Sequence, residues 1–311
     1  MSTFLRFLSL ASLYALALVA VHAESAVAEA HEAPPTPVPP GFALVPAGEF
    51  MMGDALDGIR NAPQHRVNVS AFSMQKYLVT NAQWDEVLDS ALKHGYNDLK
   101  KAGGKAAQHP VVGISWYAAV KWCNARSERD GLVPCYYTDI DLKQVYRTGE
   151  NELSNAMVRW DANGYRLPTE AEWEKAGRGG LIGKRLPWGD IISHNQANFC
   201  NLRQEGYQTG SAGYHPAYKR GTSPVGSFAA NAYGLYDMAG NVNEWCWDRL
   251  GLYPEVLETD PRGLDSGMGR VRRGGCWADS ESGYRVARRL GQGAGFFIQV
   301  DGLRPVRRTI L

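Results

Sequence analysis

The chain has 311 residues, of which 44% are hydrophobic and 21% charged, so it can bury a sizeable core and is not a mostly disordered protein. Its 33 basic and 32 acidic residues nearly cancel, which argues against a nucleic-acid partner, because such proteins normally carry a basic excess. The 34 glycines, 9 tryptophans and 15 tyrosines predict a loop-rich fold held by large rings and disfavour a helical bundle.

The first 23 residues predict an export signal. Arg6 supplies a positive charge, residues 7–21 form an apolar stretch, and residues 21–23 (VHA) offer the small side chains that signal peptidase accepts. The apolar stretch is shorter than the roughly 20 residues that span a bilayer, which favours cleavage after Ala23 over a membrane anchor. We therefore expect an exported protein, periplasmic or extracellular, with no membrane span after cleavage.

Residues 24–40 predict a linker. They are rich in alanine and glutamate and end in PPTPVPP, a composition that buries no core and forms an extended tether. The folded part is predicted to begin near Gly41 and to continue as one domain through residue 311. Within it, residues 42–52 predict a β-hairpin or a bent pair of strands, and residues 64–74 predict another strand.

Three helices are predicted from their starting residues. Thr80 begins a capping box (TNAQ), Ser115 precedes a second apolar stripe, and Thr169 with Glu172 forms another capping box. From Leu181 onward regular patterns mostly vanish. A long irregular stretch in a compact domain is typical of functional loops or of loops held by an ion.

The five cysteines that follow the signal have no CxxC spacing, so a structural zinc site has little support. An odd number leaves at least one thiol outside any disulfide within the chain, and the preferred interpretation is buried, small hydrophobic side chains with room for one or two bridges among them. If a bridge forms, the first pair to test is Cys123 with Cys135, at a helix end and in the loop that follows.

Four segments stand out in order along the chain: VPAGEFMMG (45–53), YRLPTEAEWE (165–174), YGLYDMAGNVNEW (233–245) and RVRRGGCW (270–277). Together they resemble the formylglycine-generating-enzyme family, also called the sulfatase-modifying-factor domain, over residues 42–308. The resemblance implies a C-type-lectin-like variant fold, α+β and loop-rich, in a single domain.

The third segment predicts a calcium site. Asp237 and Glu244 are oxygen ligands around a Gly-Asn turn, and Ca²⁺ takes hard oxygen ligands together with loop carbonyls. The resemblance implies a structural Ca²⁺ held by both side chains and by the carbonyls of Gly240 and Val242. The alternative is a buried carboxylate pair satisfied by backbone donors.

A second calcium site is implied by the resemblance but incomplete in the sequence. It would use Asn198 and the carbonyl of Phe199. No carboxylate among residues 205–218 can be assigned to it, so its presence stays open.

The fourth segment bears on activity. The enzymes of this family carry two cysteines, four residues apart, after the double glycine, and these soft thiolates bind the copper that activates oxygen. Here Cys276 is the one cysteine of the stretch. Counted from the glycines, Asp279 and Tyr284 occupy the two positions; counted back from Arg285, Cys276 and Glu281 do. The two-cysteine copper mode, and with it formylglycine generation, is therefore not expected.

Two functions remain open. The first is a binding or accessory module whose face, which includes Trp277, Tyr284, Arg285 and Arg289, takes a peptide, protein or glycan, because aromatic residues and arginine carry binding hot spots. For Trp277 taken by itself, the sequence favours a buried position in the core over a place on this face. The second is an oxidative modifying enzyme, acting on a peptide or small molecule, with a non-standard catalytic metal site around Cys276, Asp279 and a histidine. Metal content separates the two.

Overall fold

The computed structural model describes residues 37–309 except 57–60, 203–205, 255 and 280. The predicted signal peptide and most of the predicted linker lie outside the described residues. The described part is a mixed α+β fold with short strands and few helices, as the sequence predicts. Among the described residues, no helix combines the length and apolarity that crossing a membrane requires.

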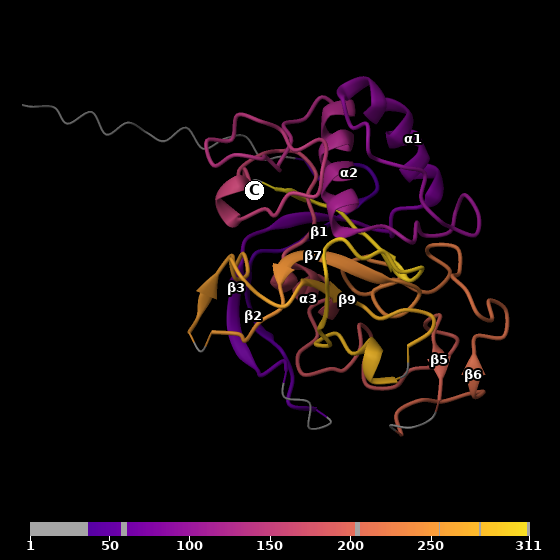
Figure 1. The fold of residues 1–311 in the computed structure, drawn as a ribbon. Helices are drawn as coiled ribbons and strands as arrows, with labels where there is room; N and C mark the ends of the chain where they lie inside the picture. The colour runs from indigo at the N-terminus through magenta and orange to yellow at the C-terminus, as the bar shows by residue number, and fades with distance from the viewer. Residues whose placement is uncertain (1–36, 57–60, 203–205, 255, 280, 310–311) are drawn as a thin grey trace, which may run out of the picture. The chain divides into compact units, whose positions relative to one another are not determined.

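All three predicted helix starts are confirmed. The helices are α1 (Asn81–Ala91), α2 (Trp116–Arg129) and α3 (Glu170–Arg178), with short 3₁₀ turns η2 (Leu92–His94), η3 (Asn155–Met157) and η4 (Glu281–Tyr284). Both predicted capping boxes form, at Thr80 and Thr169. Helices α1 and α2 pack side by side through stacked indoles of Trp84 and Trp122, whose ring centroids are 5.8 Å apart (Figure 1).

The N-terminal strands belong to two sheets. One contains β1 (Phe42–Val45), β4 (Phe72–Gln75) and β12 (Val306–Arg308); the other contains β2 (Gly48–Met52), β3 (His65–Val69) and β8 (Glu258–Thr259). Strands β1 and β2 pair with β4 and β3 and not with each other, so residues 42–52 form a bent pair of strands and not a hairpin. The single strand expected at 64–74 is divided into β3 and β4.

The central sheet has the order β10 (Leu290–Gln292), β9 (Arg270–Arg273), β7 (Asn243–Arg249) and β11 (Asp301–Gly302), and β5 (Cys200–Asn201) pairs with β6 (Gly213–Tyr214). Strand β7 is the longest of the described strands, and the sequence did not predict it. Six of its seven residues are buried, so its sequence lacks the alternation that reveals a half-exposed strand.

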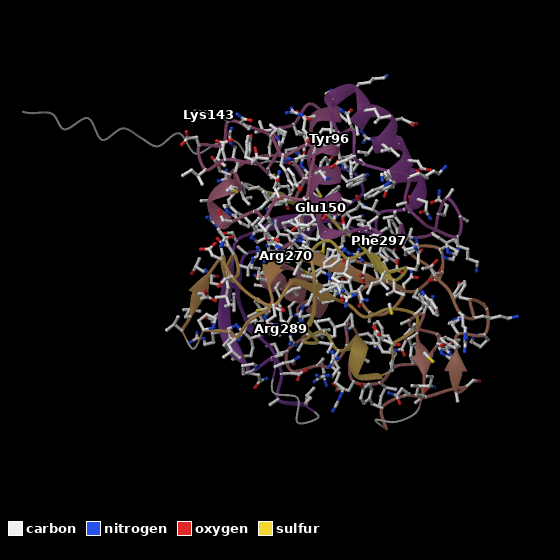
Figure 2. All side chains as sticks on the ribbon, in the orientation of Figure 1. Tyr96, Lys143, Glu150, Arg270, Arg289 and Phe297 are labelled. Carbon is white, nitrogen blue, oxygen red and sulfur yellow. The ribbon has the colours of Figure 1, made fainter. Side chains whose placement is uncertain are left out.

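The core is rich in aromatic rings and also contains arginines. Trp247 of β7 stacks on Tyr136 at 5.5 Å and meets Trp160 edge-on at 5.7 Å. Figure 2 labels Arg270 and Arg289, which are only 2% and 4% exposed. An aromatic core among irregular loops is what the composition predicts.

The first disulfide to test does not form. Cys123 and Cys135 are fully buried, unbridged thiols, as are Cys246 and Cys276. Burial raises the pKa of Cys123 and Cys135 and disfavours their thiolate forms. These four cysteines therefore act as buried, small hydrophobic side chains and not as halves of disulfides.

Candidate functional site

The three glutamates of α3 are all buried, and each is paired with arginine. The pairs are Glu170 with Arg289, Glu172 with Arg166, and Glu174 with both Arg178 and Arg273. The Glu172 pair is bidentate, with two N–H···O distances of 2.6 Å. The RLPTEAEWE segment therefore supplies buried charges that join α3 to distant parts of the chain.

Electrostatics at α3 differ from one carboxylate to the next. Burial alone would raise the pKa of Glu174, but Arg178 and Arg273 outweigh it and hold this pKa below its ordinary value. Asp248 of β7 accepts the backbone N–H of Glu170 at 2.6 Å, and no arginine forms an ion pair with it among the described residues. Burial, and then the charge of Glu170, raise the pKa of Asp248 to about 8.

Glu244, one of the two side chains predicted to bind calcium, forms an ion pair with Arg304. Arg304 donates from Nε and Nη2 to the Glu244 carboxylate, both at 2.9 Å, and the Trp173 indole N–H donates to it at 2.9 Å. Arg304 also donates to the carbonyl oxygens of Lys76 and Tyr236. A guanidinium thus holds the carboxylate and the loop carbonyls that surround it.

Asp237, the other predicted calcium side chain, is at φ 57° in the Gly-Asn turn. One of its carboxylate oxygens accepts the N–H of Gly226 at 2.7 Å, and the other is buried without a hydrogen-bond partner among the described residues. Burial raises the pKa of Asp237 to about 6. One available oxygen is far from the six to eight that Ca²⁺ takes, and the Arg304 charge opposes a cation beside Glu244. The site predicted from Asp237, Gly240, Val242 and Glu244 therefore does not fit calcium in this arrangement.

The second predicted calcium site is held by protein groups as well. The Asn198 amide donates to the Gly221 carbonyl at 2.9 Å, and its own oxygen has no partner among the described residues. The Phe199 carbonyl lies 3.2 Å from a ring nitrogen of His194. The structure does not add the missing carboxylate, because the described His, Cys, Asp and Glu side chains form no group of three suited to a metal ion.

The loop after the double glycine is locked to the Gly-Asn turn. The N–H of Gly240 donates to the Gly274 carbonyl at 2.8 Å, and the N–H of Trp277 donates to the Asn241 carbonyl at 2.9 Å. The backbone carbonyl of Asn198 lies so close to Gly240 that a Cβ there would be 2.5 Å from it. Two of the family-like segments thus form one packed unit.

Cys276 and Asp279 close a turn within this loop. The N–H of Cys276 donates to the Asp279 carboxylate at 2.9 Å, and the N–H of Asp279 donates to the Cys276 carbonyl at 3.0 Å. Cys276 is 2% exposed, and burial, then the Asp279 charge, raise the pKa of its thiol. The structure brings the two predicted catalytic residues together, but as a buried thiol and a turn-capping carboxylate.

Tyr284 lies between this loop and β5. Its phenol oxygen accepts the backbone N–H of Cys200 at 3.1 Å, and its ring contacts Phe199 at a centroid distance of 5.1 Å. Burial is the main cause that raises the pKa of Tyr284, and the Cys200 N–H that donates to its phenol oxygen acts in the opposite direction. The backbone of Cys200 thus contacts this phenol, and a Cβ on Gly275, the residue before Cys276, would lie 2.9 Å from the Tyr284 ring, a neighbourhood that the sequence spacing did not indicate.

Three of the four residues predicted to form the binding face do not lie on the surface. Tyr284 and Arg285 are fully buried and Arg289 is 4% exposed. Arg285 is paired with Asp54 at 2.7 Å, and Arg289 with Glu170. Trp277 is half-buried, so it alone of the four reaches the surface.

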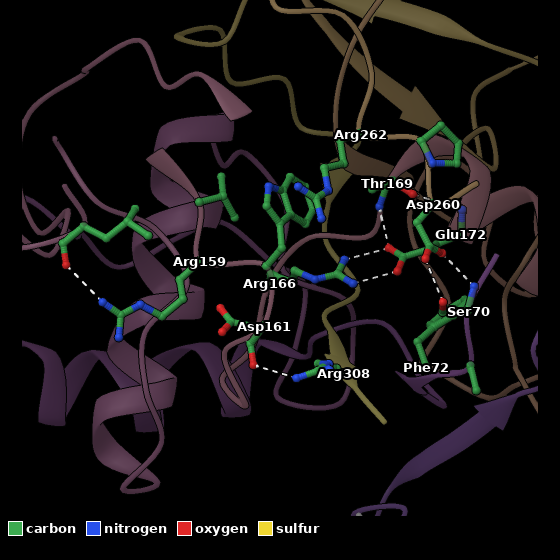
Figure 3. A pocket seen from close by; sticks show the side chains of 15 residues that line it. Ser70, Phe72, Arg159, Asp161, Arg166, Thr169, Glu172, Asp260, Arg262 and Arg308 are labelled. Atoms are coloured by element: carbon green, nitrogen blue, oxygen red, sulfur yellow. Dashed lines mark hydrogen bonds and ion pairs between the residues drawn. The ribbon is translucent and has the colours of Figure 1, made fainter. Parts of the chain in front are cut away.

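A pocket that the sequence did not predict lies away from this loop. It has a volume of 490 Å³ and is lined by residues from the segments 70–72, 158–172 and 260–262, with Leu142 and Arg308 (Figure 3). No residue of 274–284 lines it. No local sequence signal indicated it, because its arginines, Arg159, Arg262 and Arg308, come from separate segments of the chain.

The fold and its packed loops define a C-type-lectin-like α+β domain with a buried-charge core. The family described as "Sulfatase-modifying factor enzyme 1-like domain" matches residues 27–309, and the chain belongs to this family.

Three similarities place the chain within that family. A formylglycine-generating enzyme from Thermomonospora curvata is 33% identical over 283 residues, which cover 82% of this chain and 89% of that enzyme. "Chaperone protein LppX" from Paenibacillus barcinonensis is 33% identical over 255 residues, covering 79% and 81%. Among solved structures, Treponema denticola variable protein 1 matches with a TM-score of 0.67 and 28% identity, covering 86% of this chain and 94% of that one.

Proposed function

We propose that this chain is an exported binding or accessory domain of its family and does not itself generate formylglycine. The observation that carries the proposal is the loop after Gly274 and Gly275, which offers one buried thiol, Cys276. Copper activation of oxygen in this family's mode needs two soft thiolates, and burial disfavours even this one. A relative named as a chaperone protein supports an accessory role.

A second function, oxidation at a non-standard metal site, is favoured by one observation. The backbone of Cys200 and Gly275, the residue before Cys276, both lie against Tyr284, so two segments that each carry a buried thiol meet at this ring. Thiols are the ligands that a soft metal prefers. Against this function stands the tight backbone packing around both, and the histidine foreseen for such a site is absent from any described metal-suited group.

Metal analysis of the purified domain separates the two functions. Copper and iron would be quantified after exposure to each metal, followed by oxygen uptake in the presence of a thiol reductant. We expect substoichiometric copper and iron and no oxygen uptake above the protein-free rate. Cys200→Ser and Cys276→Ser serve as the variants, and Cys123→Ser, a buried thiol far along the chain, as the matched control.

The contrary result is equally clear. One equivalent of copper that is lost in both Cys200→Ser and Cys276→Ser, but kept in Cys123→Ser, would establish the oxidative function. Near-UV circular dichroism of each variant would verify that the fold is retained, so that loss of metal is not loss of structure.

A further inference from the structure

The 490 Å³ pocket is built on a buried ion pair. Arg166 and Glu172 form its floor through two 2.6 Å hydrogen bonds, and the Thr169 N–H donates to Glu172 at 2.8 Å (Figure 3). Arg166 also lies 5.4 Å from the Trp160 ring. The charges of the floor are therefore mutually satisfied, and the floor is rigid.

The rim of the pocket carries cations that lack acidic partners. Arg159 donates to the Leu142 carbonyl at 3.1 Å, Arg308 donates to the Asp161 carbonyl at 3.2 Å, and Arg262 lies over the Trp160 ring at 4.8 Å. Within the described part of the chain, none of the three arginines forms an ion pair, since each contacts only a backbone carbonyl or a ring.

The acidic residues of the pocket do not balance these arginines. Both oxygens of Asp260 accept hydrogen bonds from Ser70, from its N–H at 2.6 Å and from its hydroxyl at 2.7 Å. Glu172 is held by Arg166. Asp161, whose side chain is exposed, is the one lining carboxylate without a described partner, and Asp260 is held by neutral donors alone, so the three rim cations face two carboxylates and outnumber them by one.

Backbone strain supports a binding role for this pocket. Leu142 has φ 55° and Asp260 has φ 47°, and both line the pocket. A leucine in the left-handed region is strained, because its Cβ approaches the following carbonyl. Strained residues of this kind cluster where ligands are held. The Leu142 carbonyl is also the group that orients Arg159.

We propose that the pocket binds a small organic ligand through an oxyanion group, a carboxylate, sulfate or phosphate. The planar guanidinium fork matches each of these groups, and the volume falls in the usual range for small-molecule sites. Arg262 and Arg308 offer guanidinium groups from different sides of the pocket (Figure 3), so the anion binds beside one of them, and the half-buried Trp160 supplies an apolar wall. This inference goes beyond the proposed function, because the pocket shares no residue with the loop after the double glycine.

Isothermal titration of the purified domain tests the pocket with three probes: succinate, inorganic sulfate and inorganic phosphate. Ionic strength is held constant with sodium chloride, because exposed charges are screened by salt. We expect saturable binding of at least one probe. A preference for succinate points to a carboxylate ligand, and a preference for sulfate or phosphate to a tetrahedral anion.

Variants connect that binding to the pocket. At least one of Arg262→Ala and Arg308→Ala should weaken it about tenfold, the value of a lost charge-assisted hydrogen bond. Asp161→Asn should strengthen it about two- to fivefold, because a nearby like charge is removed. Misfolding cannot produce that gain. Arg220, exposed and 5.2 Å from the Tyr214 ring, is the matched control, and Arg220→Ala should bind as the original protein does.

The proposal is overturned by either of two results. One is the absence of saturable binding for all three probes. The other is binding that Arg262→Ala and Arg308→Ala leave unchanged, or that Arg220→Ala weakens equally, since the anion would then bind elsewhere or without specificity. Neither result depends on whether the domain oxidises a substrate.

Discussion

Two regions of this domain differ in whether their charged side chains are paired. In the family-like segments, Glu174 and Glu244 are buried and fully paired with arginines. In the pocket beside α3, Arg159 and Arg262 reach solvent without an acidic partner among the described residues. The segments that identify the family therefore stabilise the scaffold here, and the open charges that could meet a ligand lie elsewhere.

Removal of Arg304 should lower the stability of the protein more than any other change considered. Arg304→Ala leaves the Glu244 carboxylate buried without its cation, so we expect the free energy of unfolding to fall by about 3–5 kcal/mol. Chemical denaturation measures it. Lys143→Ala, at an exposed pair with Asp141, is the control and should change stability little.

The Arg304–Glu244 pair also makes a prediction for calcium. Because Arg304 occupies Glu244, added Ca²⁺ should not raise the melting temperature of the original protein. A Ca²⁺-dependent rise that Glu244→Gln abolishes would show that the ion displaces the arginine, since a ligand specific to the folded state stabilises it by mass action.

The close packing of the Gly-Asn turn against its neighbours, at Gly240, predicts the next largest loss of stability. Gly240 has φ 79°, and a Cβ there would lie 2.5 Å from the Asn198 carbonyl oxygen. Gly234 has φ 77° with open space around it, so Gly234→Ala reports the backbone cost alone, about 1 kcal/mol. Gly240→Ala should cost about 1–3 kcal/mol more, because overpacking is added. Equal losses in thermal denaturation would contradict the lock.

The pH dependence of stability sharpens the electrostatic contrast. The pKa of Asp248 is raised in the folded state to about 8, so above its ordinary value of 3.8 the folded protein keeps a proton that the unfolded chain releases. Stability should therefore fall as pH rises from about 4 to 8, by at most about 1.4 kcal/mol per pH unit from this group. Asp248→Asn keeps an acceptor for the Glu170 N–H and should flatten that slope. An unchanged slope in melting temperature against pH would contradict the assignment.

Local signals in the sequence were sufficient to predict where the three α-helices begin. Thr80 and Thr169 cap their helices with side chains only three residues from their partners, and such short-range chemistry can be read directly. Strand β7 was missed because it is buried along six of its seven residues and shows no alternation. The family resemblance supplied the fold class, which the structure and the relatives confirm.

The site was less predictable because its partners are far apart in sequence. Arg304 reaches Glu244 across 60 residues, and Arg285 reaches Asp54 across 231. Nothing local distinguishes a buried arginine from one on a binding face, so Arg285 was assigned to the wrong environment. The pocket has the same origin, since its rim is assembled from separate segments.

The smallest expected effect comes from the pocket rim. Arg262 and Arg308 are exposed and form no described ion pair, so replacing either with alanine should change the free energy of unfolding by no more than about 0.5 kcal/mol. Denaturation midpoints measure this. A loss near that of Arg304→Ala would mean that the rim is part of the scaffold, and the contrast between the two regions would disappear.

The most direct test of the central claim is mass spectrometry of a sulfatase-derived cysteine peptide incubated with the pure domain, copper, oxygen and a thiol reductant. The claim that the loop around Cys276 serves the scaffold predicts that no aldehyde forms on the peptide. Aldehyde that appears with the original protein and is lost with Cys276→Ser would contradict it.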